Sequence, residues 1–405
     1  MIDKKVLFLV LAMLCLMVFG SFLFVAKASP AVIRVPLDYS TIQEAIDHAN
    51  PGDTVSVSAG TYYENPYIDK NLTLTGENRE TTILNASSGW YGIHANYTSV
   101  NITGFTIVNA TVGIFLENCS DSTVSNNDVT GSNADINSQE EGIWLYACNN
   151  SAVTDNLIHN CGQCGLILCG HSSGDTVTIN TITGCGTALE LSGERSLIYH
   201  NNFVNNQNQT YVLDSFYNDL NDTYEGNYWS NYNGTDANQD GIGDTPYTAD
   251  ANNIDYYPLM GMFSQFEITE QGQTYTVPTI CNSTITNFNF GIPYPAPISF
   301  NTTGPQDTDG FCRMVLPEAF FDRALSFYYT ILVDGLPPLA QKELPLSNST
   351  HIYLYFTFHN SPHNIIITIP EFPTMLCLLI IILTIPLVAV VRKRQRKTRT
   401  KQKQK

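Results

Sequence analysis

The sequence predicts an all-β protein, in which a parallel β-helix over residues 29–260 is followed by a small β-sandwich over residues 261–370. Two observations predict this fold. Three short registers of alternating apolar residues recur together every 21 to 29 residues between positions 92 and 204. After position 263 the alternating stretches are longer, and turn signals such as Asp334-Gly335-Leu336-Pro337-Pro338 separate them. The strand periodicity of both parts leaves no room for helical repeats.

The first 28 residues are typical of a secretory signal peptide. Lys4 and Lys5 precede an apolar run over 6–25, and Ala26-Lys27-Ala28 fits a cleavage site with small residues. The run is long for a signal peptide, so an uncleaved anchor is the alternative. Thirteen N-x-[ST] sequons lie between the two apolar ends of the chain and fit an exported glycoprotein.

The entry to the predicted β-helix carries its own signals. Ile33-Arg34-Val35 predicts a strand, and Ser40 is placed to cap a short helix. Ile42, Ala45, Ile46 and Ala49 share one face of that helix. Such an amphipathic helix would cover the open end of a solenoid, which must be capped.

The repeat itself is clearest in a small-apolar-x-apolar pattern. It occurs at Gly92-Ile93-His94-Ala95, Gly113-Ile114-Phe115-Leu116, Gly142-Ile143-Trp144-Leu145, Gly165-Leu166-Ile167-Leu168 and Ala188-Leu189-Glu190-Leu191. Each coil therefore carries three short strands with turns rich in Asn, Gly and Ser between them. A polar insert near 132–140 is expected to form a loop. Asn residues that precede strands are expected to stack as ladders in the turns: Asn127, Asn156, Asn180 and Asn202.

Cysteines recur in phase with the coils. Cys119 and Cys148 occupy one repeat slot, and Cys161 and Cys185 occupy another. Stacked strands lie ~4.8 Å apart, close to the Cα spacing of a disulfide. We therefore expect either two disulfides or a ladder of buried free thiols. Cys161-x-x-Cys164 lacks a second pair with zinc spacing, which disfavours a metal or redox role.

These residues carry a family resemblance. YSTIQEAIDHANPGDTVSVSAGTYYE and the following LTLTGEN resemble the N-terminal entry of pectin-lyase-like right-handed β-helix proteins. The Asn- and Gly-rich coils resemble the NosD-type, or CASH (carbohydrate-binding and sugar hydrolase), subset. The segment 225–260 is similar to the closing segment of NosD-like archaeal surface proteins. The resemblance implies a right-handed β-helix, but it implies little chemistry because this fold serves both enzymes and non-enzymes.

Residues 261–370 resemble juxtamembrane domains of archaeal surface proteins. Cys281 and Cys312 are their only cysteines, and we expect a disulfide between them. Pro370-Glu371-Phe372 stands at the start of an apolar span over 371–391, and a basic tail over 392–405 follows the span. This order resembles PEF-CTERM sorting signals, which implies processing by an archaeosortase-type enzyme. A permanent single-pass membrane anchor explains the same residues, with the tail in the cytoplasm and the body at the cell surface.

The charge distribution narrows the classes of binding partner that we expect. The formal net charge is −18, and the last 14 residues hold 9 of the 19 Lys and Arg residues. Between residues 29 and 374 acidic residues outnumber basic ones by 36 to 7. A body this acidic does not suit a phosphate backbone, which argues against nucleic-acid binding. It suits cations and neutral polymers.

One loop has the spacing of a calcium site. Oxygen ligands stand at positions 1, 3, 5 and 9 of the segment 236–244, with Gly at position 6 and a backbone carbonyl at position 7. The expected ligands are Asp236, Asn238, Asp240, Ile242 (through its carbonyl group) and Asp244. Tyr247 stands where an EF-hand has its bidentate Glu, so Asp250 or Asp255 would have to substitute. A turn without an ion is the alternative.

One outward face of the coils is the candidate binding site. We expect His94, Phe115, Trp144, Ile167 and Glu190 in one row, and Asn96, Glu117, Tyr146, Cys169 and Ser192 in the next. Phe115, Trp144 and Tyr146 could stack on a sugar chain that Glu117 hydrogen-bonds. Packing of Phe115 and Trp144 under the 132–140 insert is the alternative.

Two functional classes follow from these features. The first is a non-catalytic surface protein, anchored in the membrane, whose β-helix binds a polysaccharide or a cell-envelope glycan. The second is a polysaccharide lyase or epimerase. Such an enzyme needs a base and a way to neutralise a uronate, yet only Arg195 is basic among the coils, so no catalytic residue is assigned. His159, His171 and His200 are scattered, and no His/Met/Cys cluster supports the copper role that the NosD name suggests.

Overall fold

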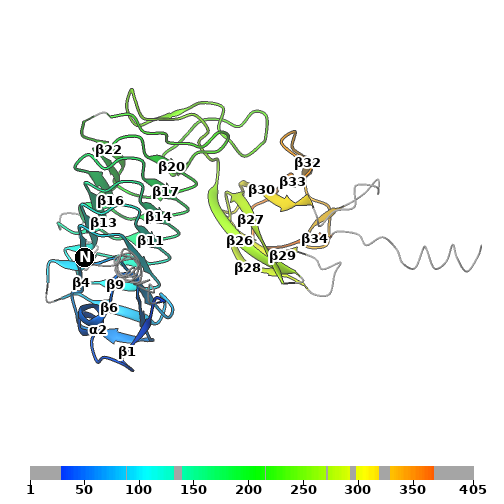
Figure 1. Ribbon diagram of the computed structural model, residues 1–405. Coiled ribbons are helices and arrows are strands. Elements are labelled where there is room, and N and C mark those ends of the chain that lie inside the picture. The colour runs from blue at the N-terminus through cyan, green and yellow to red at the C-terminus, as the bar shows by residue number, and fades with distance from the viewer. Residues whose placement is uncertain are drawn as a thin grey trace, which may run out of the picture.

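The computed structural model describes residues 29–87, 89–131, 139–214, 216–270, 272–291, 298–318 and 329–368. The expected signal peptide, the membrane span over 371–391 and the basic tail lie outside these residues, as does most of the 132–140 insert. Within the described ranges no helix is long and apolar enough to cross a membrane. The predicted all-β architecture of the body is confirmed, and its main part is a right-handed β-helix (Figure 1).

Three parallel sheets form the β-helix, and each coil gives one strand to each sheet. Sheet A comprises β1 (Val32–Val35), β2 (Thr54–Val57), β5 (Leu72–Gly76), β8 (Val100–Thr103), β11 (Thr123–Ser125), β14 (Ala152–Thr154), β17 (Thr176–Thr178) and β20 (Leu197–Tyr199). Sheet B comprises β3 (Gly60–Tyr62), β6 (Thr82–Asn85), β9 (Thr106–Val108), β12 (Asp128–Thr130), β15 (Leu157–His159), β18 (Thr181–Thr183), β21 (Asn202–Val204) and β23 (Tyr228–Trp229). Sheet C comprises β4 (Tyr67–Ile68), β7 (Tyr91–Asn96), β10 (Val112–Glu117), β13 (Glu141–Tyr146), β16 (Cys164–Cys169), β19 (Thr187–Leu191) and β22 (Asn208–Val212).

The core of the β-helix consists of stacked aliphatic side chains. The middle residue of each three-residue strand points inward and is buried, because neighbouring residues of a strand point to opposite sides. Three columns run along the interior, and their members are Ile102, Val124, Val153, Val177 and Ile198 in sheet A, Ile107, Val129, Ile158, Ile182 and Phe203 in sheet B, and Ile93, Ile114, Ile143, Leu166 and Leu189 in sheet C.

A buried asparagine ladder follows the turn between sheets A and B. Its members are Asn127, Asn156, Asn180, Asn201 and Asn227, and all are at most 1% exposed. The side-chain oxygen of Asn180 accepts hydrogen bonds from the backbone and side-chain nitrogens of Asn156, both at 3.0 Å. Its Nδ2 donates to the carbonyl groups of Val153 (2.8 Å) and Thr178 (3.1 Å). The ladder satisfies buried polar groups that tight turns leave without partners.

The predicted ladder was correct for three of its four residues. Asn201, not Asn202, is the next member of the ladder. Ile182 pairs with Phe203, so Asn202 lies beside Thr181, and it is Asn201 that hydrogen-bonds Asn180. Asn202 instead lies on the outward side of β21. There it bonds the main chain of Phe263, accepting from its N–H at 2.7 Å and donating to its carbonyl at 2.9 Å.

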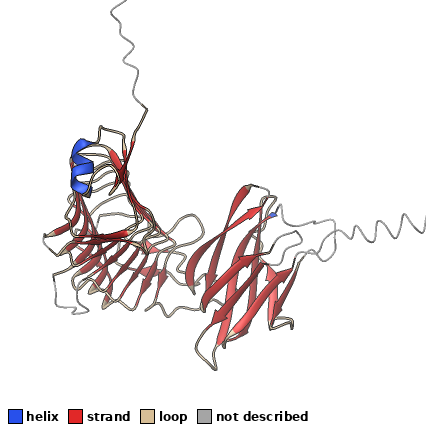
Figure 2. Ribbon diagram, turned by 90° about the horizontal axis from the view of Figure 1, so that it is seen from below, coloured by secondary structure: helices blue, strands red, loops and turns tan. Residues whose placement is uncertain are grey.

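The helix α2 (Ile42–His48) stands where the sequence placed it, beside the first coil (Figure 2). Ile42, Ala45 and Ile46 are fully buried in the β-helix core, which confirms its apolar face. The N-cap is Thr41 and not Ser40, since Thr41 has the extended backbone of a cap and its hydroxyl accepts from the Glu44 N–H at 3.2 Å. Ser40 hydrogen-bonds the Glu44 carboxylate instead.

After β23 the chain leaves the coils through the small pair β24 (Tyr247–Thr248) and β25 (Ile254–Asp255). Two antiparallel sheets follow. One comprises β26 (Met262–Glu270), β27 (Gln273–Cys281), β30 (Asp309–Pro317), β33 (His351–His359) and β32 (Ala340–Glu343). The other comprises β28 (Thr284–Phe290), β29 (Ile298–Thr303), β34 (His363–Thr368) and β31 (Thr330–Val333). Residues of both sheets share one apolar core, as in a sandwich (Figures 1 and 2).

Asn180→Ala tests the ladder. The change removes the partner of the Asn156 amide and of the Val153 and Thr178 carbonyl groups. We expect the free energy of unfolding to fall by about 3 kcal/mol or more, because each buried polar group left without a partner costs ~1–3 kcal/mol. Denaturation of the full-length protein, followed by circular dichroism, measures this. Asn101→Ala, at an exposed position of β8, is the control and should change stability by less than about 0.5 kcal/mol. Equal losses in the two variants would contradict the role of the ladder.

Candidate functional site

The outward side of sheet C, which we call face C, aligns the predicted binding residues. Phe115 pairs with Trp144 and with His94 on the neighbouring strands, and Trp144 pairs with Ile167. In the second row Glu117 pairs with Asn96 and Tyr146. The two predicted rows are therefore confirmed as far as Glu190 in the first row and Cys169 in the second.

Aromatic rings run continuously across three strands of face C. The ring of Tyr91 stacks on Phe115 with centroids 4.9 Å apart, and Phe115 lies 4.9 Å from Trp144. Phe115 is only 6% exposed because its neighbours cover it, whereas Trp144 is half-buried and Tyr146 is 42% exposed. The outer surface that a ligand meets is thus formed by Trp144 and Tyr146, with Phe115 as their support.

Polar contacts hold these rings in place. Nε1 of Trp144 donates to Sγ of Cys169 at 2.9 Å. The ring of Tyr146 lies against the next coil, where a Cβ at Gly170 would approach it to 2.8 Å. Gly170 also has φ +65°, a backbone conformation that favours glycine. Glu117 and His94 form a pair at 3.1 Å between Oε2 and Nε2. Face C therefore presents fixed rings beside a carboxylate.

Sequence reasoning missed one further carboxyl group on this face, that of Glu141, which begins β13. Glu190, which the sequence placed in the first row, lies two strands from Trp144 in that row. Burial raises the pKa of Glu141 to about 7, and the charge of Glu190 adds to the effect. Burial also raises the pKa of Glu190. Oε2 of Glu141 is buried and has no hydrogen-bond partner among the described residues. A Glu directly before the Gly of the repeat was the only signal in the sequence.

The segment 236–244 folds as a tight loop beyond the last coil. The Asp236 carboxylate accepts from the N–H groups of Asp240 (2.9 Å) and Gly241 (2.8 Å), and Asp240 accepts from Ile242 (2.9 Å). Asn238 accepts from the Asp240 N–H at 3.1 Å, and Asp244 accepts from Ala237 at 2.6 Å. Among the described residues no three acidic, His or Cys side chains are arranged as a metal site. The calcium prediction stays a prediction.

All eight cysteines of the described chain are free thiols in the structure. This agrees with the thiol-ladder alternative for the four cysteines of the coils, whereas a disulfide was expected between Cys281 and Cys312. The predicted partners nevertheless lie beside one another. Cys281 and Cys312 face each other across β27 and β30. The thiols of Cys119 and Cys148 influence each other's pKa, as do those of Cys161 and Cys185, so each pair lies close together. The three pairings are therefore correct as contacts, and the covalent bonds stay predictions.

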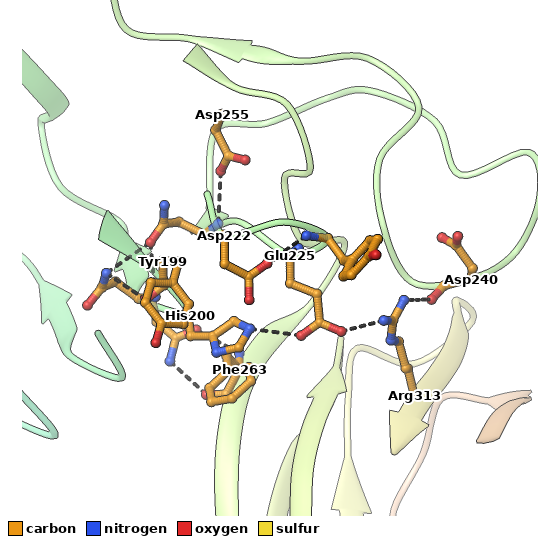
Figure 3. Close-up of polar contacts among 12 residues, drawn as sticks. Tyr199, His200, Asp222, Glu225, Asp240, Asp255, Phe263 and Arg313 are labelled. Carbon is orange, nitrogen blue, oxygen red and sulfur yellow. Dashed lines mark hydrogen bonds and ion pairs between the residues drawn. The ribbon is translucent and has the colours of Figure 1, made fainter. Parts of the chain in front are cut away.

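A second polar cluster lies where the β-helix meets the sandwich (Figure 3). The Arg313 guanidinium of β30 pairs with the Glu225 carboxylate and donates to the Asp240 carbonyl at 2.9 Å. Nε2 of His200 lies 2.8 Å from Oε2 of Glu225, and its ring stacks on Phe263 at 3.9 Å. Burial opposes the charge of Glu225, but the His200 hydrogen bond and the positive charge of Arg313 lower its pKa overall.

This cluster mainly stabilises the junction between the β-helix and the sandwich. Arg313 is 1% exposed and Glu225 is 7% exposed, so the ion pair is sealed from solvent between the two parts. A cavity of about 210 Å³ lies beside it, lined among others by Asp222, His351 and Tyr353. A buried, hydrogen-bonded ion pair favours one fixed arrangement of the groups around it. The contacts thus fix the sandwich on the last coil, while face C stays on the β-helix alone.

The match to a protein-family model covers most of the β-helix. Residues 39–234 match the model described as periplasmic copper-binding protein (NosD). This confirms the resemblance seen in the sequence, and the chain contains a NosD-like β-helix.

Among curated proteins, a cell surface glycoprotein of the archaeon Methanothermus fervidus is 36% identical over 94 residues. The match covers 22% of this chain and 16% of the length of that glycoprotein. An alginate lyase from a Paenibacillus species is 14% identical, with a TM-score of 0.36 over 50% of this chain and 77% of the lyase. The tailspike protein gp49 of Acinetobacter baumannii bacteriophage Fri1, a capsular polysaccharide depolymerase, is 10% identical, with a TM-score of 0.19 over 84% of this chain and 86% of the tailspike. Such TM-scores support no argument about this chain.

The donor groups of this chain do not fit the copper role in the name of the family model. Copper sites gather His, Met or Cys ligands around one point. In the described parts of the β-helix the histidines stand apart, and three of them each contact a carboxylate: His94 with Glu117, His159 with Asp128, and His200 with Glu225. The cysteines are buried in the coils, with the exception of the half-buried Cys169.

Glu141→Gln tests the raised pKa on face C. Between pH 4.5 and about 7 the folded state binds more protons at Glu141 than the unfolded state, so stability falls as the pH rises through this window. Glutamine cannot ionise. The variant should therefore be more stable than the wild type at pH 8, by on the order of 1 kcal/mol after allowance for solvent screening, and similar to it at pH 4.5. Chemical denaturation at both values measures this.

The exposed Glu80→Gln is the matched control and should leave the pH dependence of stability unchanged. If Glu141→Gln has the same pH dependence as the wild type, the group does not titrate near neutrality and the assignment is wrong.

Proposed function

We propose that this chain, with its NosD-like β-helix, is a cell-surface protein that binds a polysaccharide or cell-envelope glycan along face C without cleaving it. The observation that supports the proposal most is the row of rings that ends in the half-buried Trp144. The exposed Tyr146 lies in the next row, where it pairs with Glu117 and its carboxylate. Aromatic rings stack on the apolar faces of sugars, and a carboxylate accepts hydrogen bonds from their hydroxyl groups.

The geometry of face C suits a long ligand and not a small one. Its residues lie on successive coils spaced ~4.8 Å apart, so the contacts extend along the axis of the β-helix. Phe115 is held between Tyr91 and Trp144, which fixes the rings before a ligand arrives. Little side-chain entropy would be lost on binding such a prearranged surface.

The charges of face C favour binding over catalysis. A lyase or epimerase acting on a uronate must neutralise its carboxylate, commonly with Arg, Lys or a metal ion. The described strands of sheet C contain no Arg or Lys residue. Glu117, Glu141 and Glu190 make the face acidic, which disfavours a polyanionic substrate and favours a neutral glycan.

A polysaccharide-cleaving or epimerising enzyme is the second candidate, and a specific observation favours it. Glu141 has a pKa of about 7, which suits a general acid or base at neutral pH, and the His94–Glu117 pair lies on the same face.

The surface location rests on the sequence and on one relative. The matched glycoprotein is described as a cell surface protein, which supports an extracellular body. The apolar span over 371–391 and the basic tail over 392–405 would anchor that body in the membrane. Archaeosortase-type processing at Pro370-Glu371-Phe372 is the alternative fate of this segment. Mass spectrometry of the C-terminus of the mature protein distinguishes the two.

Trp144→Ala and Tyr146→Ala test the site. Each ring is expected to contribute roughly 1 kcal/mol of stacking, so each variant should bind about fivefold more weakly. A pull-down of the full-length protein with a panel of plant polysaccharides and envelope glycans measures this. Tyr63→Ala, at an exposed ring outside the strands of sheet C, is the control. Unchanged binding in both site variants would remove the assignment to face C.

The same samples test the absence of cleavage. We expect the wild-type protein to release neither new reducing ends nor unsaturated sugars from any polysaccharide that it binds. Product that accumulates with the wild type and disappears in Glu117→Gln or Glu141→Gln would instead establish the enzyme.

We also propose that the loop 236–244 binds calcium in a structural role. Burial raises the pKa of Asp236, and the charge of Asp240 adds to it, so a cation would relieve the crowding of these carboxylates. Calcium would also strengthen the junction, because Arg313 and Lys342 donate to the Asp240 and Asn238 carbonyl groups of the same loop.

Thermal melting with calcium and with a chelator tests this second proposal. At a calcium concentration a hundredfold above Kd the folded state should gain roughly 2.7 kcal/mol. Asp240→Ala should abolish the gain, and Asp69→Ala, at an exposed position between β4 and β5, should retain it. Superimposable melts of the wild type with and without calcium would refute the site.

A further inference from the structure

The outward side of sheet A, which we call face A, carries two regular columns of small polar side chains. Alternate residues of its short strands point outward, and the parallel register stacks them from coil to coil. At the two ends of sheet A the outward positions hold Val32 and Arg34 in β1, and Leu197 and Tyr199 in β20. In the six strands between them, one column is Thr54, Thr73, Asn101, Thr123, Ala152 and Thr176, and the other is Ser56, Thr75, Thr103, Ser125, Thr154 and Thr178. Ten of these twelve residues are Thr or Ser.

Strand propensity alone does not explain this composition. Threonine favours strands, but so do Val, Ile and aromatic residues, and none of these occupies any of the twelve positions. The outward side of sheet B in the same coils is mixed, with Ile83, Val108, Asp128, Leu157 and His159. The uniform character therefore belongs to face A in particular.

The hydroxyl groups of face A are largely unused by the protein. Of the twelve side chains, only that of Thr75 makes a hydrogen bond to a described residue, with the Gly76 carbonyl at 3.3 Å, and Oγ1 of Thr178 is buried with no partner among the described residues. Eleven of the twelve side chains are half-buried, and that of Asn101 is exposed. Because threonine is branched at Cβ, its hydroxyl has few alternative positions to lose on binding.

The charge and shape of face A indicate which class of ligand it would bind. None of the twelve residues is ionisable, while the protein as a whole carries a net charge of −18. A polyanion would be repelled by the surrounding molecule, and a cation would find no carboxylate on this face. Small side chains give a flat surface with a repeat of ~4.8 Å between coils and ~6.6 Å between columns. A flat, uncharged polymer with many hydroxyl groups matches such a regular array of side-chain hydroxyl groups.

We propose that face A is a second glycan-binding surface, which takes an extended neutral polysaccharide of the cellulose or chitin type lying along the axis of the β-helix. Equatorially linked sugars in such a chain repeat over a distance close to the spacing of the coils. Each hydroxyl group contributes little by itself, so binding arises from several coils together. The proposal extends the function proposed for face C and does not depend on it.

A depletion assay tests this surface. It measures how much of the full-length protein leaves the solution when microcrystalline cellulose or chitin is added. The wild type should bind at least one of the two polymers. Thr123→Lys/Thr154→Lys, which adds charge and bulk to adjacent coils, should lower the apparent affinity at least tenfold. Thr183→Lys, at a half-buried outward position of sheet B, should bind within twofold of the wild type. Polymer binding that is lost in Trp144→Ala and retained in the lysine variant would assign it to face C and overturn the proposal.

Thr123→Val/Thr154→Val retains the shape of face A and removes two hydroxyl groups, so it serves if the lysine variant does not fold. We expect about threefold weaker binding. The proposal is overturned if the wild type binds neither polymer, or if both double variants bind as the wild type does. It is also overturned if face A instead mediates self-association, seen as a dimer in sedimentation that Thr154→Lys abolishes.

Discussion

The hydrogen bonds of the buried asparagine ladder are the constraint on which the rest of this structure depends. Each coil of a β-helix must begin sheet B at the same point as the coil before it, or its inward and outward residues change places. Asn127, Asn156 and Asn180 enforce this by bonding the backbone of the neighbouring coils. Once the coils are in register, the columns on the outer faces follow automatically.

The three outer faces differ although one backbone produces them. Face C has rings and carboxyl groups, face A has hydroxyl groups, and the outward side of sheet B is mixed where the sandwich docks through Asn202. The core accounts for only every second residue of each strand, so the remaining positions are free to serve binding. This division explains how a regular solenoid can present a specific surface.

Much of this fold could be predicted because its contacts are periodic in the sequence. The inward columns, the rows of face C and the cysteine neighbours all followed from the repeat. Asn202 was misplaced, because two adjacent asparagines fit the ladder and only the pairing of Phe203 decides between them. The contact of Arg313 with Glu225 spans 88 residues and leaves no local signal. The raised pKa of Glu141 arises from burial by neighbouring coils, which the sequence does not reveal.

Oxidative footprinting of the full-length protein tests most directly whether face C is the glycan-binding surface. Hydroxyl radicals label accessible rings, and mass spectrometry locates the labels with and without a saturating polysaccharide. Labelling of Trp144 and Tyr146 should fall on binding, while that of the exposed rings of Tyr63, Tyr224 and Tyr256 should not change. Unchanged labelling of Trp144 and Tyr146 under saturating ligand would contradict the account.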